Sequence, residues 1–365
     1  MGHLAGGKDE AYRALAERLS RFPVGVVINE KLMEILKILY EEKEAAVGAK
    51  FPVKPRPLAE IVELTGMPEQ VLTAVLNVMA EKGLVVDIPR KNTTYYMLSP
   101  VVVGFFEYSL MRADRASLRE LSLLFDEYFK DRSAVEEIFG SDTKMFRALV
   151  YERYIPELIR TEVMNYEKAE TVIRESGGGG LSICACRHKN LHLGKPCRYP
   201  MEDICTSLSR PAEWLIRRGF ARRASVDDLL RNLERSYKLG LVLTADNVID
   251  EPAYICHCCG CCCGPLQAIK DHRVHAIQPS NFLPQIDPEA CLSCDACVDA
   301  CHINALQGTE AAEPVLSREL CIGCGVCASV CPSGALQMAR QDTIYTPPQN
   351  KMAQLTNIAI ERQRF

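Results

Sequence analysis

Residues 291–302 read CLSCDACVDACH, and residues 321–332 read CIGCGVCASVCP. Each segment spaces four cysteines as C-x2-C-x2-C-x3-C. The two segments form an internal repeat, because Ala305-Leu306 and Ala335-Leu336 follow them at the same offset. Three thiols from a tight turn and a fourth from the residues after it can surround a cubane iron–sulfur cluster. The spacing therefore predicts two clusters in this part of the chain.

This double pattern resembles the bacterial-type 2[4Fe–4S] ferredoxin domain, over about residues 282–340. The resemblance implies that the fourth cysteine of each run reaches the cluster of the other run. It implies one cluster on Cys291, Cys294, Cys297 and Cys331, and a second on Cys321, Cys324, Cys327 and Cys301. Pro332 follows Cys331 as the pattern requires, but His302 follows Cys301. Because proline contributes a fixed φ and not a ligand, this departure concerns local rigidity more than ligation.

The two clusters are not expected to be equivalent. Gly323 and Gly325 leave room for backbone N–H groups near the sulfurs of the second run, whereas Ser293 and Asp295 occupy those places in the first. A carboxylate near a cluster opposes the addition of an electron. We therefore predict the lower potential for the cluster of the first run.

The composition points to a globular protein of several domains. The chain has 365 residues, 48% of them hydrophobic, and a formal net charge of -4, which argues against nucleic-acid binding by the whole surface. Its 18 cysteines are not accompanied by a signal-peptide pattern or by an apolar run long enough for a membrane span. We expect a reducing, cytoplasmic location with metal-bound thiolates, and an anaerobic or low-oxygen host.

The chain divides into five predicted segments. They are a winged-helix-like module (1–98), a helical region (99–176), a cysteine-rich putative metal or iron–sulfur domain (177–281), the ferredoxin domain (282–340) and a tail that packs on the body or frays (341–365). The expected fold is multidomain and mainly α, with a small α+β ferredoxin-like C-terminal domain. ESGGGG at 175–180 predicts a hinge, a linker or a close approach of the backbone to a bulky group.

Residues 30–98 predict helices followed by a β-hairpin, the order of a winged helix. The candidate recognition helix exposes Glu69, Gln70, Thr73, Asn77 and Glu81, with Lys82 as its basic residue. Arg90 and Lys91 add cations on the hairpin. DNA binding needs phosphate-binding cations on such a helix, so docking or dimerisation is the expected role.

The middle region holds further cysteines without ferredoxin spacing: Cys184, Cys186, Cys197, Cys205, Cys256, Cys258, Cys259, Cys261, Cys262 and Cys263. Zinc, redox-active thiols and one or two further iron–sulfur clusters remain open, and we favour the clusters. The first four of these cysteines form the preferred ligand set. In the later run, alternation of an extended backbone places Cys258 and Cys262 on one side and Cys259, Cys261 and Cys263 on the other.

Charged and imidazole side chains accompany these cysteines. Cations beside an anionic cluster would raise its potential or dock an anionic substrate, and the candidates are Arg187, His188, Lys189, Arg198, Arg217, Arg218, Arg222 and Arg223. His188, His192 and His257 are expected to be non-ligands, because imidazole binds iron–sulfur irons only in special cases.

The function that the sequence favours is electron transfer between a redox partner protein and a cysteine-ligated centre in the middle region. An iron–sulfur oxidoreductase with its terminal site there, and a cluster-based redox-sensing regulator that binds DNA, remain alternatives. Catalytic residues are not identified, and no nucleotide or flavin motif is present. We expect no membrane span and no nucleic-acid partner, and a homodimer through the N-terminal module.

Overall fold

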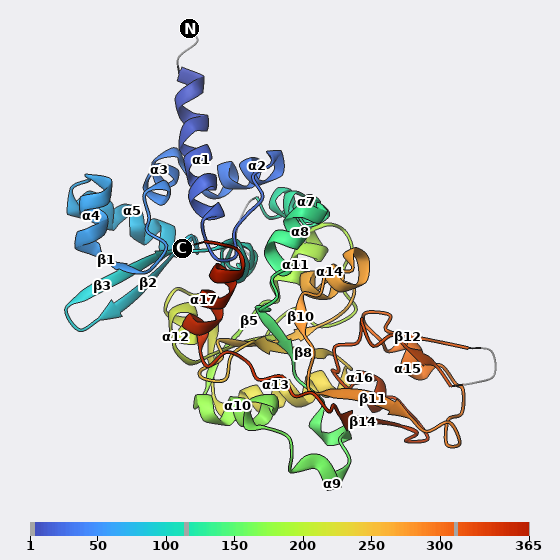
Figure 1. Ribbon diagram of the computed structural model, residues 1–365. Coiled ribbons are helices and arrows are strands. Elements are labelled where there is room, and N and C mark those ends of the chain that lie inside the picture. The colour runs from blue at the N-terminus through green and yellow to red at the C-terminus, as the bar shows by residue number, and fades with distance from the viewer. Residues whose placement is uncertain (1–3, 113–116, 310–312, 365) are drawn as a thin grey trace.

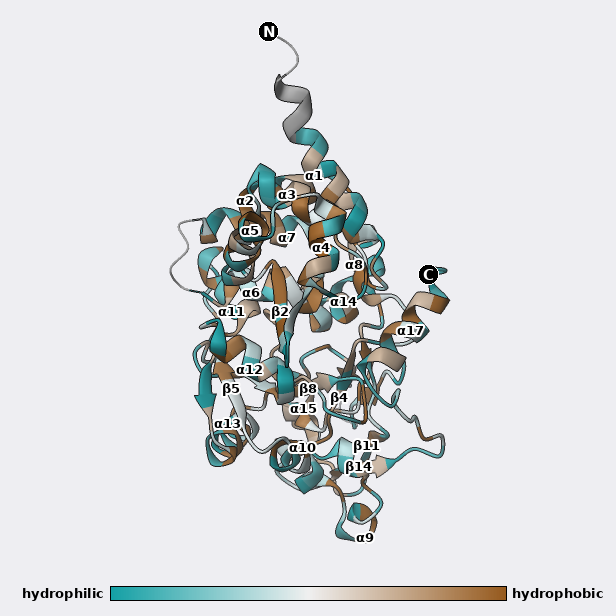
Figure 2. Cartoon of the chain, turned by 90° about the vertical axis from the view of Figure 1, so that its left-hand side faces the viewer, coloured by the Kyte–Doolittle hydropathy of each residue, from teal (hydrophilic) through white to brown (hydrophobic). Residues whose placement is uncertain are grey.

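Helices and strands are mixed along the computed structural model, which describes residues 4–112, 117–309 and 313–364 (Figure 1). About 45% of the chain is helix and 15% is strand. The prediction of a mainly α protein underestimated the strands, because most of them are too short to show a clear alternation of apolar and polar residues. In Figure 2, hydrophobic and hydrophilic residues alternate along the helices near the N-terminus, the pattern of helices that bury one side.

The N-terminal body contains α1 (Leu4–Ser20), α2 (Glu30–Leu39), α3 (Glu42–Ala49), α4 (Leu58–Thr65) and α5 (Glu69–Glu81). Strands β1 (Arg56–Pro57), β2 (Val85–Arg90) and β3 (Thr93–Leu98) pair antiparallel in the order β1-β3-β2. Helix α4 ends at Gly66, whose φ of 69° lies in the left-handed region that glycine adopts easily. The predicted helices and hairpin are present, and the assignment of a winged helix to them stays a prediction.

The segment predicted to be helical over residues 99–176 also contains a strand. Its helices are α6 (Phe106–Leu110), α7 (Leu118–Tyr128), α8 (Arg132–Phe139), α9 (Glu157–Arg160) and α10 (Ala169–Ser176), with short 3-10 turns at Glu152–Tyr154 and Asn165–Glu167. Strand β4 (Phe146–Ala148) interrupts them and is buried along its whole length. The helical prediction is wrong for β4, because pairing with distant strands decides its conformation.

A central sheet organises the middle region. Its described strands lie in the order β10-β4-β8-β9-β6-β5-β7, antiparallel except for the parallel pair of β10 and β4. The strands of this region are β5 (Gly179–Ser182), β6 (Cys205–Leu208), β7 (Arg222–Ala224), β8 (Val242–Asp246), β9 (Tyr254–Cys258) and β10 (Ile277–Gln278). The helices are α11 (Ala185–His192), α12 (Ser209–Arg217), α13 (Val226–Lys238) and α14 (Gly264–His272).

The glycine-rich segment before β5 brings two backbones close together. A Cβ at Gly179 would lie 2.1 Å from the carbonyl oxygen of Ser207 on the neighbouring strand. Gly177 caps α10 with a φ of 70°. The close approach is to the backbone of a neighbouring strand, whereas the sequence predicted approach to a bulky group, and the segment ends one helix and starts a strand inside the sheet.

The cysteine-repeat region, residues 282–340, consists of two similar halves. Strand β11 (Phe282–Ile286) pairs antiparallel with β14 (Leu336–Arg340), and β12 (Leu306–Gln307) pairs with β13 (Val315–Leu316). The short helices α15 (Ala296–Asp299) and α16 (Val326–Ser329) follow the two cysteine turns and pack on each other. The antiparallel pairing of β11 with β14 joins the beginning of the region to its end.

The C-terminal segment returns to the N-terminal body through α17 (Lys351–Glu361), shown in red in Figure 1. Gln354 is fully buried, and Arg364 hydrogen-bonds the carbonyl groups of Phe22 and Pro23. Of the two predicted outcomes for the tail, packing on the body is observed. A continuous buried cluster that runs from Leu15 to Ile358 joins the segments, so the predicted domain boundaries remain a prediction.

None of the helices in the described ranges is both long enough and apolar enough to cross a bilayer. The longest, α1, carries charged residues along its length.

Candidate metal–sulfur centres

Two cavities within the described part of the cysteine-repeat region are each bounded by four cysteines. Cys291, Cys294, Cys297 and Cys331 line the first cavity, and Cys301, Cys321, Cys324 and Cys327 line the second. Each cavity thus collects three cysteines of one run and the last cysteine of the other. Four thiols around each space fit the ligand requirement of a cubane cluster. The two sets are the same as those assigned from the sequence.

The two cysteine turns share an unusual backbone. Ser293 and Asp295 have φ values of 50° and 54°, and Gly323 and Gly325 have 64° and 81° at the matching positions. Gly323 has no alternative, because a Cβ there would lie 2.0 Å from the carbonyl oxygen of Phe282. Amide groups point at sulfur: Gly323 N–H donates to Cys321 Sγ at 3.4 Å, and Ala305 N–H donates to Cys301 Sγ at 3.2 Å. Such hydrogen bonds stabilise thiolates and tune cluster potentials.

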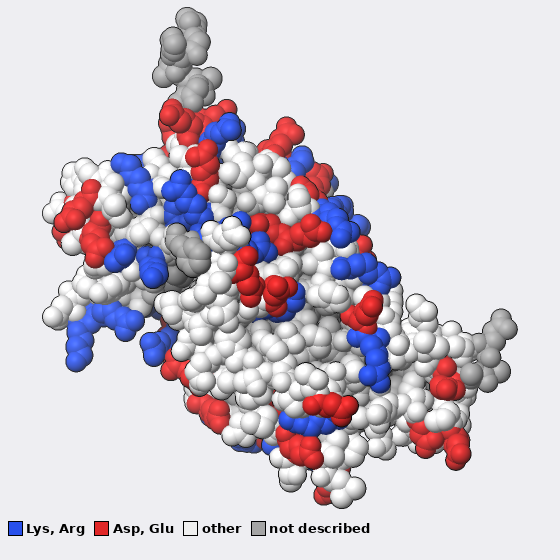
Figure 3. Space-filling model, viewed as in Figure 1, with Lys and Arg blue, Asp and Glu red and all other residues white. Residues whose placement is uncertain are grey.

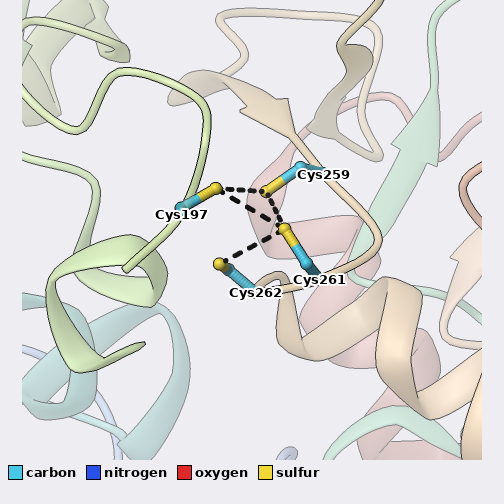
Figure 4. A group of neighbouring side chains, drawn as sticks. All are labelled: Cys197, Cys259, Cys261 and Cys262. Atoms are coloured by element: carbon cyan, nitrogen blue, oxygen red, sulfur yellow. Dashed lines mark hydrogen bonds between the residues drawn. The ribbon is translucent and has the colours of Figure 1, made fainter. Parts of the chain in front are cut away.

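In the middle region a compact group brings together Cys197, Cys259, Cys261 and Cys262, here called the four-cysteine group (Figure 4). Cys197 Sγ lies 3.6 Å from Cys259 Sγ and 3.5 Å from Cys261 Sγ. Cys261 Sγ lies 3.4 Å from Cys259 Sγ and 3.6 Å from Cys262 Sγ. Figure 4 shows these sulfurs pointing toward one another from two separate segments.

These distances indicate how many metal ions the four-cysteine group suits. Four thiolates placed tetrahedrally at about 2.3 Å from one zinc ion would be about 3.8 Å from each other. Four of the six sulfur–sulfur distances are 3.4–3.6 Å, close to that edge, and all six are within 4.8 Å. The cysteines of the two cavities in the cysteine-repeat region form no such compact group among the described residues. The four-cysteine group therefore fits a single tetrahedral ion, whereas the two cavities are wider, as clusters require.

Buried polar side chains hold the four-cysteine group in place. The amide nitrogen of Asn190 donates to Cys262 Sγ at 3.2 Å and to the carbonyl of Cys261 at 3.1 Å. Hydrogen bonding from Cys262 and the nearby guanidinium of Arg187, which outweigh the effect of burial, lower the pKa of Cys259 to about 5. In turn, burial raises the pKa of Cys261, and the hydrogen bond with Cys259 raises the pKa of Cys262. The group therefore favours one thiolate, at Cys259, and the thiolate is the form that binds metal.

His302 connects the cysteine-repeat region to the four-cysteine group. Its Nδ1 accepts a hydrogen bond from the backbone N–H of Gly260 at 3.2 Å, and its Nε2 donates to the carbonyl of Gly240 at 2.7 Å. Gly260 lies between Cys259 and Cys261, and His302 follows Cys301 directly. A Cβ at Gly260 would lie 2.1 Å from the carbonyl oxygen of His302, so the two backbones are also in close contact. The sequence showed this residue only as a departure from the expected proline.

The remaining cysteines of the middle region line a cavity of about 80 Å³, here called the cysteine cavity, which adjoins the four-cysteine group because Cys259 and Cys262 also line it. They are Cys184, Cys186, Cys205, Cys256, Cys258 and Cys263. The set preferred from the sequence is therefore divided, because Cys197 lies in the four-cysteine group and its three predicted companions lie here. Sequence distance could not reveal this division, since Cys197 meets partners more than sixty residues away.

The cations predicted to lie beside the middle cysteines differ in burial and in their partners. Arg187 is buried between the two cysteine sets, whereas Lys189 pairs with Asp126 and Arg198 is exposed beside Tyr199. The other candidates pair with carboxylates elsewhere: Arg217 and Arg218 with Asp87, Arg222 with Asp203 and Arg223 with Glu213.

The histidines of this region hydrogen-bond to protein groups. His188 Nδ1 contacts the carbonyl of Leu110 at 2.6 Å, and His192 lies against His188. His257 Nε2 meets Thr206 Oγ1 at 3.1 Å, and burial lowers the pKa of His257 to about 3. These imidazoles belong to the polar network around the cysteines.

Comparison with known proteins gives a match for one part of the chain. No curated protein and no solved structure matches it at a significant level. Residues 284–338 match the family model described as a 4Fe-4S dicluster domain, and this stretch contains both cysteine runs. The C-terminal part of the chain is therefore a 4Fe-4S dicluster domain that holds two [4Fe–4S] clusters.

Proposed function

We propose that this protein transfers electrons, and that the dicluster domain passes single electrons between an external redox partner protein and a redox-active ion in the four-cysteine group. Binding of two [4Fe–4S] clusters supports the first half of this proposal, because such clusters exchange one electron at a time. The compact set of thiols at residues 197, 259, 261 and 262 supports the second. An iron ion held there by four thiolates would alternate between the ferric and ferrous states.

The observation that carries the proposal is the contact between His302 and Gly260. Cys301 lines one of the two cluster cavities, and the next residue accepts a hydrogen bond from the turn that joins Cys259 to Cys261. A short path of covalent bonds and one hydrogen bond therefore leads from a cluster ligand to two ligands of the middle ion. Both ring nitrogens of His302 have protein partners, which holds the imidazole in one orientation.

A second candidate function is an oxidoreductase whose terminal site lies among the middle cysteines. The cysteine cavity favours this candidate, because a space of about 80 Å³ beside the four-cysteine group offers room for a further group. Turnover with a reduced dye and a panel of small oxidants separates the enzyme from the carrier. Multiple turnovers with one oxidant would establish the enzyme.

For the N-terminal body we propose a docking or dimerisation role. The exposed surface of α5 includes Glu69, Gln70 and Glu81, and Lys82 is paired with Glu44. On the face drawn in Figure 3, acidic and basic side chains both lie over this body, and a group of basic side chains lies at its lower left, near the β2–β3 hairpin that carries the exposed Arg90 and Lys91. These cations lie outside the candidate recognition helix, whose exposed side chains offer little of the positive charge that phosphate binding requires. A mobility shift of duplex DNA at moderate salt would overturn this role in favour of the DNA-binding regulator.

The test of electron transfer uses His302→Ala in the full chain, purified anaerobically. The clusters are reduced rapidly, and reduction of the middle ion is followed by its absorbance. Loss of the imidazole removes the hydrogen-bonded path. We therefore expect the rate of reduction of the middle ion to fall roughly 10- to 100-fold, as is typical when a group that hydrogen-bonds next to a metal ligand is removed. The EPR signals of the two clusters and the iron content should not change.

The matched control is His275→Ala, which removes an exposed imidazole away from the cysteines. Its rate should equal that of the unaltered chain. An unchanged rate in the His302 variant would contradict the proposed path. Zinc in place of iron in the four-cysteine group, measured on the natively purified chain, would overturn the role of this group as an electron acceptor.

A further inference from the structure

The cysteines of the cysteine cavity come from strands of the central sheet and from the beginnings of two helices. Cys205 begins β6, and Cys256 and Cys258 lie two residues apart on β9, so both point to one face of the central sheet. Cys184 and Cys263 are the residues that precede α11 and α14, and Cys186 lies in the first turn of α11. All six are free thiols in the structure. The cavity therefore lies between the sheet and the beginnings of two helices.

The six sulfurs form a chain of neighbours around this space. Neighbouring thiols interact in pairs: Cys184 with Cys186, Cys256 with Cys205 and Cys258, and Cys258 with Cys263. The hydroxyl of Thr244 lies 3.5 Å from Cys258 Sγ. Among the described residues, these six do not form a compact group like the four-cysteine group. Sulfurs spread around a cavity suit several metal ions better than one.

Backbone amides at the two helix starts are directed at the sulfurs. The backbone amides of Arg187, Gly264 and Leu266 are the ones that favour a thiolate at Cys184, Cys186 and Cys263, respectively. Free amides at a helix N-terminus carry partial positive charge and stabilise thiolates. Two helices thus favour negative charge in the same cavity.

Arg187 provides an independent indication of negative charge at this place. Its side chain is 1% exposed and lines the cavity, and its Nε has no hydrogen-bond partner in the structure. Its terminal nitrogens donate to the carbonyl groups of Pro200 at 2.6 Å and His257 at 2.7 Å. Within the described ranges, no carboxylate forms an ion pair with it.

An isolated guanidinium in a protein interior is costly, so Arg187 needs an anionic neighbour. The groups that can provide this negative charge beside Arg187 are the thiols of Cys184, Cys258 and Cys259. Two of these belong to the cysteine cavity and one to the four-cysteine group. Metal-bound cysteines are permanently deprotonated, whereas free buried thiols are mostly neutral. Metal-bound thiolates on both sides of Arg187 would supply the negative charge that its guanidinium needs as a partner.

We propose that the six cysteines of the cysteine cavity hold a second metal–sulfur centre of the middle region, a polynuclear iron–sulfur cluster, with Arg187 as the buried cation between it and the four-cysteine group. Soft thiolate ligands select iron–sulfur clusters, zinc or copper(I). The spread of the sulfurs around a cavity distinguishes the cluster from a single zinc ion. This proposal does not depend on electron transfer through His302.

The first test uses the unaltered full chain, purified anaerobically and reconstituted with ferrous iron and sulfide. We expect more acid-labile sulfide than the two [4Fe–4S] clusters of the dicluster domain contain, and a third iron–sulfur component in the Mössbauer spectrum. Sulfide that is fully accounted for by the dicluster domain would overturn the proposal. So would zinc or copper as the metal in the cavity.

The second test compares two sets of substitutions. The triple variant Cys256→Ser, Cys258→Ser and Cys263→Ser should lose iron and sulfide together, because it leaves too few thiolates for a cluster. Cys261→Ser in the four-cysteine group is the matched control, and it should lose a metal ion without loss of sulfide. Equal sulfide in the triple variant and the unaltered chain would contradict the proposal.

Two measurements show whether each variant folds. The EPR signals of the dicluster domain and the fluorescence of Trp214, the single tryptophan of the chain, should be the same in all variants. If the triple variant does not fold, Arg187→Gln gives the second measurement. Loss of a buried cation should lower the potential of the third component without loss of sulfide. An unchanged potential would contradict the place given to Arg187.

Discussion

At Gly260 the absence of a side chain allows the dicluster domain to approach the middle cysteines. A Cβ at this position would lie 2.1 Å from the carbonyl oxygen of His302, which no side chain could accommodate without movement of one backbone. The residue before it and the residue after it are both members of the four-cysteine group. Gly260 thus allows His302, which follows a cluster ligand, to lie against the turn that carries Cys259 and Cys261.

We predict that Gly260→Ala weakens both the contact with His302 and the binding of an ion by the four-cysteine group. The contact with His302 must open, and the turn between Cys259 and Cys261 must shift, so the four-cysteine group should bind its ion less tightly, by roughly 10- to 100-fold. Metal content after dialysis against a chelator measures this. His275→Ala is the control, because it changes an exposed residue that belongs to neither set of cysteines. Equal metal retention in the two variants would contradict the prediction.

Asp295 distinguishes the two cluster cavities. It lines the cavity of Cys291, whereas Gly325 stands at the matching place in the other half. Removal of its negative charge by Asp295→Asn should raise the potential of this cluster by on the order of tens of millivolts. An EPR redox titration measures both clusters together. Asp299→Asn, which changes an exposed carboxylate outside the cavity, should leave both potentials where they are.

At the scale of elements, strand β2 is joined to helix α12 by a buried carboxylate. Asp87 accepts hydrogen bonds from Trp214 Nε1 at 2.9 Å, from Arg217 Nη1 at 2.5 Å and from Arg218 Nε at 2.9 Å. Burial raises the pKa of Asp87, but these hydrogen bonds outweigh it and bring the pKa down to about 2. The charged form is therefore stabilised by the fold.

Asp87→Asn should lower the free energy of unfolding at pH 7 by about 2 kcal/mol, since it removes this charge from two arginines. A depressed pKa contributes stability that is present above the ordinary value near 4 and is lost as the pH falls toward 2. Denaturant unfolding followed by Trp214 fluorescence measures it. The difference between the variant and the unaltered chain should be constant from pH 7 to pH 5 and shrink below pH 4. A constant difference down to pH 3 would contradict the assignment to Asp87.

At the scale of the whole molecule, the C-terminal helix connects the first and last parts of the chain. The amide nitrogen of Gln354 donates to the carbonyl groups of Lys144, Met145 and Asn247. Arg364 pairs with Glu137 at 2.6 Å. A chain shortened before residue 282 would lose these contacts together with the dicluster domain, so the metal content of the middle region is best measured in the full chain.

We predict that Gln354→Ala destabilises the protein by about 2 kcal/mol, because it leaves three buried carbonyl groups with weaker hydrogen bonding. Chemical denaturation of the cluster-loaded protein provides the measurement. Met352→Ala on the same helix is the control, since its side chain is 62% exposed and should cost little. Equal midpoints for the two variants would show that α17 does not stabilise the body.

The sequence alone determined the features that depend on local spacing. The two cysteine runs predicted the cluster-binding region, because each turn places three thiols through its own backbone. The exchange of the fourth cysteine between the runs was implied by the resemblance to dicluster ferredoxins. The β2–β3 hairpin was likewise predicted from a short run of adjacent residues.

Tertiary structure alone decided the features that depend on distant partners. Strand β4 forms because β8 and β10 lie on either side of it, and its three residues carry no periodic signal. The division of the middle cysteines also depends on long-range contact: the loop that carries Cys197 meets the turn after β9, while Cys184 and Cys186 lie over the sheet. His302 is a residue for which the sequence and the tertiary structure each gave part of the information. The sequence marked it as a departure from the pattern, and only packing against Gly260 and Gly240 gave that departure a role, because a hydrogen bond between segments has no trace in the spacing of either one.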